Sequence, residues 1–247
     1  ISAVPIRFEK GKRPRSTEAM RDWFSVHEQP QRIHALEKGL ADIIFVRDGA
    51  TAERLSELAS QAARLETDLH LQKKHRISFI SPCPEMQRRD GYRQWVYPQS
   101  RMYSSQEGTL LRMLSWVLPH DCPVEKQQIA DAVGVAGLAA SGDGRRRVVI
   151  LLINGEPRDR SFFTPDQVTA LLRQLRVPLL IWSVDPAHGL ETRWGEATDV
   201  RKLGRIGREY NRVEKDLEHQ LVVWLEGLHL PQAIELSSEI EGVSLVQ

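Results

Sequence analysis

Short, continuous apolar runs recur along the middle of the chain. The strongest lie at residues 41–46, 76–81, 145–153 and 179–184. Continuous apolar runs, as opposed to alternating ones, are typical of strands that helices cover on both faces, as in parallel sheets. The pattern therefore predicts an α/β fold: a doubly wound, mostly parallel sheet of Rossmann-like type.

Helical periodicity fills the segments between these runs. Residues 51–69 place Leu55, Leu58 and Leu65 on one helical face, and residues 108–118 and 123–140 predict two more helices. A further helix is expected after Thr164, whose hydroxyl suits the N-cap position. The strand, helix and strand between Val149 and Leu180 span about thirty residues, which favours a right-handed crossover and a parallel pair.

Other segments predict antiparallel additions to this sheet. Asp90-Gly91 is a hairpin turn signal beside the run 94–97, so an antiparallel edge hairpin is expected there. The two terminal regions contain short, partly alternating runs, which predict strands with one solvent-exposed face. We divide the chain into an N-terminal extension (1–38), a central domain (39–218) and a C-terminal strand extension (219–247) that packs with the N-terminal segment.

Composition narrows the class of function. Hydrophobic residues make up 41% and charged residues 27% of the 247 residues, and the formal net charge is +1. The chain therefore has no bulk positive field for nucleic acid, and its apolar runs are too short to span a membrane. The basic start of the third run, Arg145 to Arg147, is interpreted as a solvated strand end. Cys83 and Cys122 form either one disulfide or two buried thiols, and no CxxC spacing predicts a zinc site.

Ligands of open α/β sheets bind at the carboxyl ends of the strands, so the loops that follow the strands carry the candidate chemistry. The first strand is followed by Asp48-Gly49-Ala50-Thr51-Ala52, a later loop offers Thr109, and the third run ends in Asn154-Gly155. The order of elements and these loops resemble the von Willebrand factor A (VWA) domain over about residues 39–209. That family carries a metal-ion-dependent adhesion site (MIDAS), built from an Asp-x-Ser-x-Ser loop, a Thr and an Asp.

The resemblance implies a degenerate MIDAS in this chain. Asp48 matches the first Asp, Ala50 and Ala52 match the two serines, Thr109 matches the Thr, and Asn154 matches the final Asp. Mg²⁺ and Mn²⁺ require oxygen ligands, and two hydroxyls and one carboxylate are missing here. We therefore expect no cofactor, with weak Mg²⁺ or Mn²⁺ binding as the alternative. Local structural roles are the other interpretation: Asp48 caps the next helix, Thr109 packs at a helix start, and Asn154 forms a tight turn.

A second candidate site combines aromatic and arginine side chains. These side chains are Tyr92, Arg93, Trp95, Tyr97, Arg101 and Tyr103, and Tyr, Trp and Arg are typical of binding hot spots between proteins. The alternative is that alternate residues of this hairpin pack on the sheet while the arginines cover its rim.

The function expected from the resemblance is protein binding, as an adhesion or complex-assembly module that is not an enzyme. The partner is then another protein, with no nucleic acid and no membrane insertion, and the family implies a secreted or cell-envelope location. The alternative is an α/β hydrolase that uses Asp48 with Asp185 or His188. A third hypothesis, DNA binding as in some proteins of the same fold, conflicts with the near-zero net charge.

Overall fold

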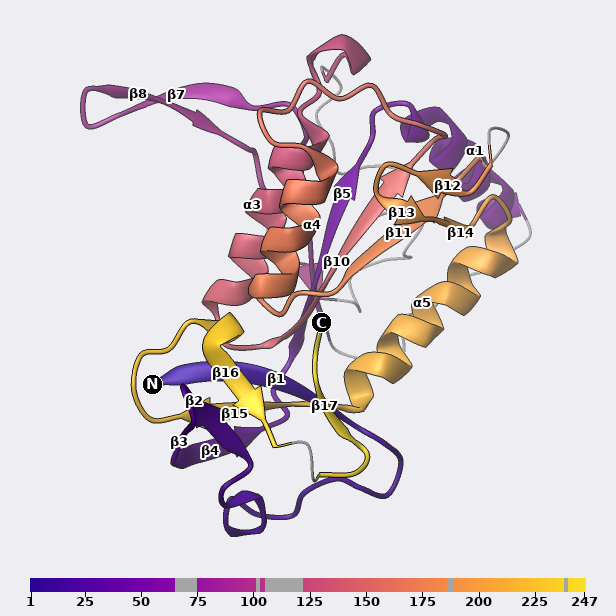
Figure 1. Cartoon of the computed structure of the whole chain (residues 1–247). Coiled ribbons are helices and arrows are strands. Elements are labelled where there is room, and N and C mark those ends of the chain that lie inside the picture. The colour runs from indigo at the N-terminus through magenta and orange to yellow at the C-terminus, as the bar shows by residue number, and fades with distance from the viewer. Residues whose placement is uncertain (65–74, 101–102, 105–121, 186–188, 238–239) are drawn as a thin grey trace.

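The computed structural model describes residues 1–64, 75–100, 103–104, 122–185, 189–237 and 240–247. Its main sheet has the strand order β14-β11-β10-β5-β6-β9, and every neighbouring pair is parallel except β6 with β9 (Figure 1). The strands are β5 (Ala41–Arg47), β6 (Arg76–Ile80), β9 (Tyr103–Ser104), β10 (Arg146–Ile153), β11 (Leu179–Ser183) and β14 (Thr198–Asp199). The doubly wound, VWA-type α/β fold predicted from the sequence is confirmed.

Helices cover both faces of this sheet. One face packs against α1 (Thr51–Arg64) and α5 (Leu203–Glu218), and the other against α3 (Ile129–Gly142) and α4 (Pro165–Gln174). Successive residues of a strand point to opposite faces, so Phe45 joins the core under α1 and α5 while Ile44 joins the core under α3 and α4. Because both faces are covered, all eight residues of β10 are buried, which explains its continuous apolar run.

Helix starts follow the sequence signals in one case and depart from them in another. The Thr164 hydroxyl accepts a hydrogen bond from Gln167 N (3.3 Å), and Gln167 Oε1 accepts one from Thr164 N (2.9 Å), which is a complete capping box. The helix expected from residue 123 begins only at Ile129, because η2 (Val124–Lys126) and an extended Gln127 come first. The expected helix at 108–118 and the end of the helix at 51–69 lie outside the described residues.

A second, antiparallel sheet brings the two terminal regions of the chain together. Its order is β17-β1-β15-β4, and it is formed by β1 (Ser2–Phe8), β4 (Ile33–Glu37), β15 (Gln220–Leu225) and β17 (Val243–Leu245). One face of this sheet packs on a smaller one, β16-β2-β3, made of β2 (Phe24–Val26), β3 (Gln29–Pro30) and β16 (Ile234–Leu236). Two short 3-10 turns, η1 (Glu18–Met20) and η3 (Pro231–Ala233), and a hairpin of β12 (Glu191–Thr192) with β13 (Gly195–Glu196) lie outside these sheets.

The basic start of β10 is buried, so its interpretation as a solvated strand end was wrong for Arg146 and Arg147. Arg147 donates to the carbonyls of Ala140, Ser141, Leu175 and Arg176, and Arg146 donates to those of Leu217 and Gly39. Ala140 and Leu217 lie in the last turns of α3 and α5, and Leu175 is the residue after α4. The last carbonyls of a helix have no partner inside that helix. The strand therefore begins where three helices end, and the guanidinium donors satisfy those carbonyls.

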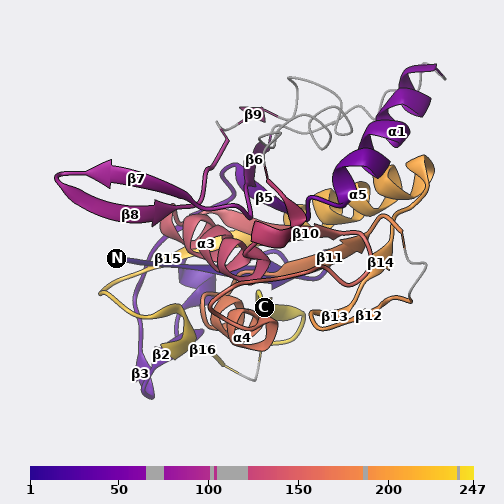
Figure 2. The same ribbon diagram turned by 90° about the horizontal axis from the view of Figure 1, so that it is seen from above.

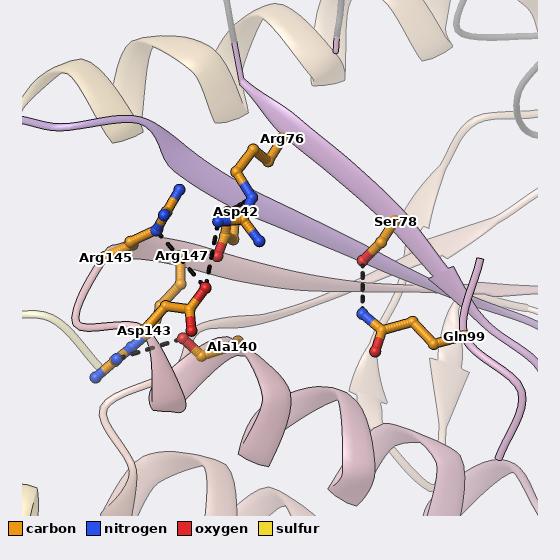
Figure 3. A network of polar contacts seen from close by, with 8 residues as sticks. All are labelled: Asp42, Arg76, Ser78, Gln99, Ala140, Asp143, Arg145 and Arg147. Atoms are coloured by element: carbon orange, nitrogen blue, oxygen red, sulfur yellow. Dashed lines mark hydrogen bonds and ion pairs between the residues drawn. The ribbon is translucent and has the colours of Figure 1, made fainter. Parts of the chain in front are cut away.

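An ion network lies beside these arginines at the same end of the sheet (Figure 3). Arg76 lies 3.2 Å from the carboxylate of Asp42, which is buried in β5, and 3.2 Å from that of Asp143, just after α3. Burial raises the pKa of Asp42 and, for Arg147, lowers the guanidinium pKa to about 10. The network thus joins the buried Asp42 of β5 to the exposed Asp143 through the partly exposed Arg76.

Candidate functional site

Two regions hold the residues that the sequence singled out. The first is the crest, which we define as the loops after β5 and β10, residues 48–52 and 154–155. The second is the arm, which we define as the hairpin of β7 (Glu85–Arg89) and β8 (Tyr92–Val96). The arm forms a two-stranded sheet of its own and extends away from the body of the molecule, as both views show (Figures 1 and 2).

The crest brings Asp48 and Asn154 together, as the resemblance requires. Asp48 is 1% exposed, and its carboxylate accepts hydrogen bonds from Ala50 N (3.0 Å) and, at the limit of length, from Asn154 N (3.5 Å). The Asn154 amide in turn donates to the carbonyl of Ala50 (3.2 Å), and the Thr51 hydroxyl to that of Asp48 (2.6 Å). Each of these hydrogen bonds lies within one of the two crest loops or links one loop to the other. Thr109 lies outside the described residues.

The crest is also covered from above. Gly49 donates to Gln127 Oε1 (3.2 Å), and a Cβ on this glycine would lie 2.3 Å from Gln127 Nε2 and 3.2 Å from the carbonyl oxygen of Cys122. A larger residue at position 49 would therefore require the Gln127 side chain to move and the Cys122 carbonyl to shift slightly. Gln127 and Cys122 thus pack closely against the first crest loop, next to the buried Asp48.

These residues do not fit a divalent metal ion. Asp48 is the only carboxylate at the crest, Ala50 and Ala52 bring no oxygen from a side chain, and Asn154 turns its amide nitrogen toward the Ala50 carbonyl. Burial raises the pKa of Asp48. The preceding residue, Arg47, is also buried, and its positive charge attracts the Asp48 carboxylate. Over the described ranges, no group of three or more His, Cys, Asp or Glu side chains is placed to hold a metal.

A shallow hollow of about 390 Å³ opens beside the crest, at the ends of β10 and β11. It is lined by Ala50, Glu53, Arg54, Glu57, Asn154, Val184, Asp185 and Arg201. Arg54 forms an ion pair with Glu57 (2.6 Å) and donates a hydrogen bond to the Arg201 carbonyl (3.4 Å). The charges of Arg54 and Glu57 are therefore paired with each other. Asp185 is exposed there, whereas Asp48 is buried and bound to backbone; His188 is outside the described part of the chain.

The arm is exposed where the crest is buried. All eleven residues from 85 to 95 are exposed. Among the large apolar ones, Met86 is 47%, Tyr92 79% and Trp95 64% exposed. The Asp90-Gly91 turn joins the strands as predicted, with both residues at positive φ. The arm does not pack on the main sheet, whose antiparallel edge position belongs to β9.

The base of the arm is firmly attached. Cys83, two residues before β7, forms a disulfide with Cys122 (Cα–Cα 5.6 Å), which resolves the choice that the sequence left open. The Pro82 carbonyl accepts a hydrogen bond from Gln128 N (2.8 Å), and Ser81 N donates to the Pro98 carbonyl (2.9 Å). Both strands of the arm are thus fixed where they leave the domain.

Tyr97, the residue after β8, belongs to this base and not to the exposed surface. Its half-buried hydroxyl lies 2.5 Å from Gln128 Oε1 and 3.1 Å from Asp131 Oδ2, at the start of α3. Burial and the Asp131 charge raise the pKa of this phenol. Of the other predicted partner-binding residues, Tyr92, Arg93 and Trp95 are on the arm, while Arg101 and the side chain of Tyr103 lie outside the described residues.

One exposed aromatic pair was not expected from the sequence. Phe162 is 90% and Phe163 53% exposed, and their rings meet edge to face with centroids 5.6 Å apart. Both backbone N–H groups donate to Asp131, the residue that also lies near the Tyr97 hydroxyl, so this phenylalanine doublet lies at the foot of the arm. The signal in the sequence is two adjacent aromatics within an otherwise polar loop, just before a helix cap.

The order and direction of the strands and the helix layers define a VWA-type α/β fold, and its crest brings Asp48 and Asn154 together. No family model matches the chain, and no curated protein matches it. Among solved structures it is similar to proximal thread matrix protein 1 from the mussel byssus, with 14% identity and a TM-score of 0.43 over 82% of this chain and 50% of that one. The same mussel protein with a zinc-occupied MIDAS motif gives 15% identity and a TM-score of 0.42 over 74% and 47%.

Human COPII-coat protein Sec24c is also similar, with 11% identity and a TM-score of 0.35 over 72% of this chain and 32% of that one. The chain thus spans about half the length of the mussel protein. The fold assignment itself follows from the order and direction of the strands in the chain's own sheet. No helix among the described residues is long and apolar enough to cross a membrane.

Proposed function

We propose that this chain is a non-enzymatic, VWA-type interaction module that binds another protein through the arm, without a divalent metal ion. The observation that carries the proposal is the arm itself: eleven consecutive exposed residues on a base fixed by a disulfide and hydrogen bonds. Exposed Trp and Tyr side chains contribute nothing to a core here, and they are the residues that most often dominate binding energy between proteins.

The fixed base also favours binding. Association costs free energy when a flexible segment must be ordered, and an element already held in place avoids much of that cost. The phenylalanine doublet extends the apolar surface at the foot of the arm. The disulfide suits an oxidising compartment, which supports the secreted or cell-envelope location implied by the family resemblance.

A capture experiment tests where the partner binds. The immobilised chain is exposed to an extract of its source organism, with and without EDTA, beside the variants Tyr92→Ala/Trp95→Ala and Leu228→Ala/Leu230→Ala. The second pair removes side chains that are 90% and 66% exposed and far along the chain from the arm. We expect a partner that survives EDTA and the control pair but is lost with the arm variant. Loss in EDTA, or equal capture by both variants, would contradict the proposal.

Calorimetric titration with Mg²⁺ and Mn²⁺ tests the metal-free part of the proposal directly. We expect no saturable heat with the wild-type chain and the same trace with Asp48→Ala. Saturable binding that the Asp48→Ala substitution abolishes would show that the crest is a working metal site.

A further inference from the structure

The register of the arm sorts its side chains into two faces. Residues directly opposite in an antiparallel pair lie on the same face, and every second pair shares that face. Met86 is opposite Trp95, and Arg88 is opposite Arg93. These four residues therefore form one face, which we call the arginine face; Gln87, Gln94, Arg89 and Tyr92 belong to the other.

The arginine face places two like charges side by side. Side chains directly opposite across a ladder have Cβ atoms about 5 Å apart, and like charges at that spacing destabilise the pair. Neither Arg88 nor Arg93 has an ion pair or hydrogen bond from its guanidinium to any residue that the structure describes. The nearest carboxylates in sequence are Glu85, which the register assigns to the other face, and Asp90 in the turn.

This arrangement selects an anionic ligand with planar oxygen pairs. A guanidinium group presents parallel N–H donors that match the two oxygens of a carboxylate. Two guanidinium groups on one face can bind one or two carboxylates, whose negative charge reduces the repulsion between the two arginines. Met86 and Trp95 continue the same face with apolar area, 47% and 64% exposed. The ligand that matches both halves has a carboxylate next to an apolar side chain.

We infer that the arginine face of the arm binds an acidic segment of the partner protein, with carboxylates on Arg88 and Arg93 and an apolar side chain against Met86 and Trp95. This inference rests on the proposed function, because it specifies the chemistry of the partner that the arm binds. An acidic protein segment fits better than a nucleic acid, which is held mainly through many phosphate contacts and a broad basic surface. The whole chain has a formal net charge of only +1.

The probe for this inference is a peptide array whose members vary independently in acidic and in apolar content, together with a single-stranded DNA oligonucleotide. Binding is compared for the wild-type chain, Arg88→Gln/Arg93→Gln, Trp95→Ala, and the control Arg173→Gln/Arg208→Gln. The control removes the same charge from exposed positions on α4 and α5. Circular dichroism confirms that each variant is folded.

We expect the wild-type chain to prefer peptides that combine acidic and apolar residues over their Gln-substituted counterparts. The Arg88→Gln/Arg93→Gln variant should bind them about tenfold more weakly, while the control variant matches wild type after correction for net charge. Trp95→Ala should lower binding of apolar-containing acidic peptides by a similar factor and leave purely acidic peptides unchanged.

Three outcomes overturn the inference. Equal binding of acidic and neutral peptides that is lost with Trp95→Ala would refute the acidic partner and leave the proposed function standing. Preference for the oligonucleotide would assign the arginines to phosphate. No binding to any peptide would also refute the inference, and the capture experiment with the arm variant then decides separately whether the proposed function fails.

Discussion

The crest consists of loops at the ends of buried strands and the arm is a hairpin of two exposed strands, and their polar groups differ in burial. At the crest, Asp48 is 1% exposed and its carboxylate accepts backbone N–H groups of the crest loops. On the arm, Arg88 and Arg93 face solvent beside exposed aromatics. A polar group satisfied inside the fold contributes to the fold, whereas one left exposed on a fixed support is available to a ligand. The proposed function therefore places binding on the arm and gives the crest a structural role.

The largest effect is expected where the arm meets the domain. The disulfide closes a loop with a sequence separation of 39, for which loop-closure entropy corresponds to about 4 kcal/mol of unfolding free energy. The variant Cys83→Ser/Cys122→Ser should lose that stability in urea unfolding and bind the partner more weakly, because the arm must then be ordered on binding. Wild-type chain treated with a reductant should behave as the variant does. Unchanged affinity with lowered stability would show that the disulfide has no part in binding.

The next effect separates stability from binding at the crest. Asp48→Ala leaves the N–H of Ala50 without its acceptor, and unpaired buried groups cost about 2 kcal/mol. We expect that loss in urea unfolding and no change in partner capture. Glu53→Ala, an exposed substitution beside the same loop, should change the unfolding free energy by about 0.5 kcal/mol or less. Weaker capture by folded Asp48→Ala would return the binding role to the crest.

The smallest effect is a pH dependence of stability. Burial raises the pKa of Asp48 above its ordinary value, so the folded chain keeps the proton over a range where the unfolded chain has released it. The free energy of unfolding of wild type should therefore fall relative to that of Asp48→Asn as the pH rises from about 4, and level off above the folded-state pKa. Asp42, whose pKa burial also raises, is present in both proteins and cancels from the difference. A difference that grows in favour of wild type with pH would contradict the assignment.

The sequence predicted the parts of the molecule that depend on local pattern. The run at 145–153 became β10, the run at 179–184 became β11, and the cap at Thr164 is in place. These features rest on apolar runs and on short-range hydrogen bonds, which a single sequence displays directly. The pairing of Asp48 with Asn154 was also predictable, because the carboxyl ends of neighbouring parallel strands meet.

What the sequence did not disclose depends on segments far apart in the chain. Arg146 and Arg147 were taken as solvated because nothing local shows that α3, α4 and α5 all end at the start of β10. The disulfide needed the Cα–Cα distance of 5.6 Å between residues 83 and 122. The relation of Phe162 and Phe163 to the arm depends on their backbone hydrogen bonds to Asp131, which also lies near the Tyr97 hydroxyl.

The complete exposure of the arm has a consequence for how this protein can change over evolutionary time. Because residues 85–95 are all exposed, substitutions there should cost less stability than substitutions in the buried strands β5 and β10. The disulfide and the Tyr97 contacts hold the base whatever the tip contains. The residues of the arm can thus be changed with little effect on the stability of the fold that supports them.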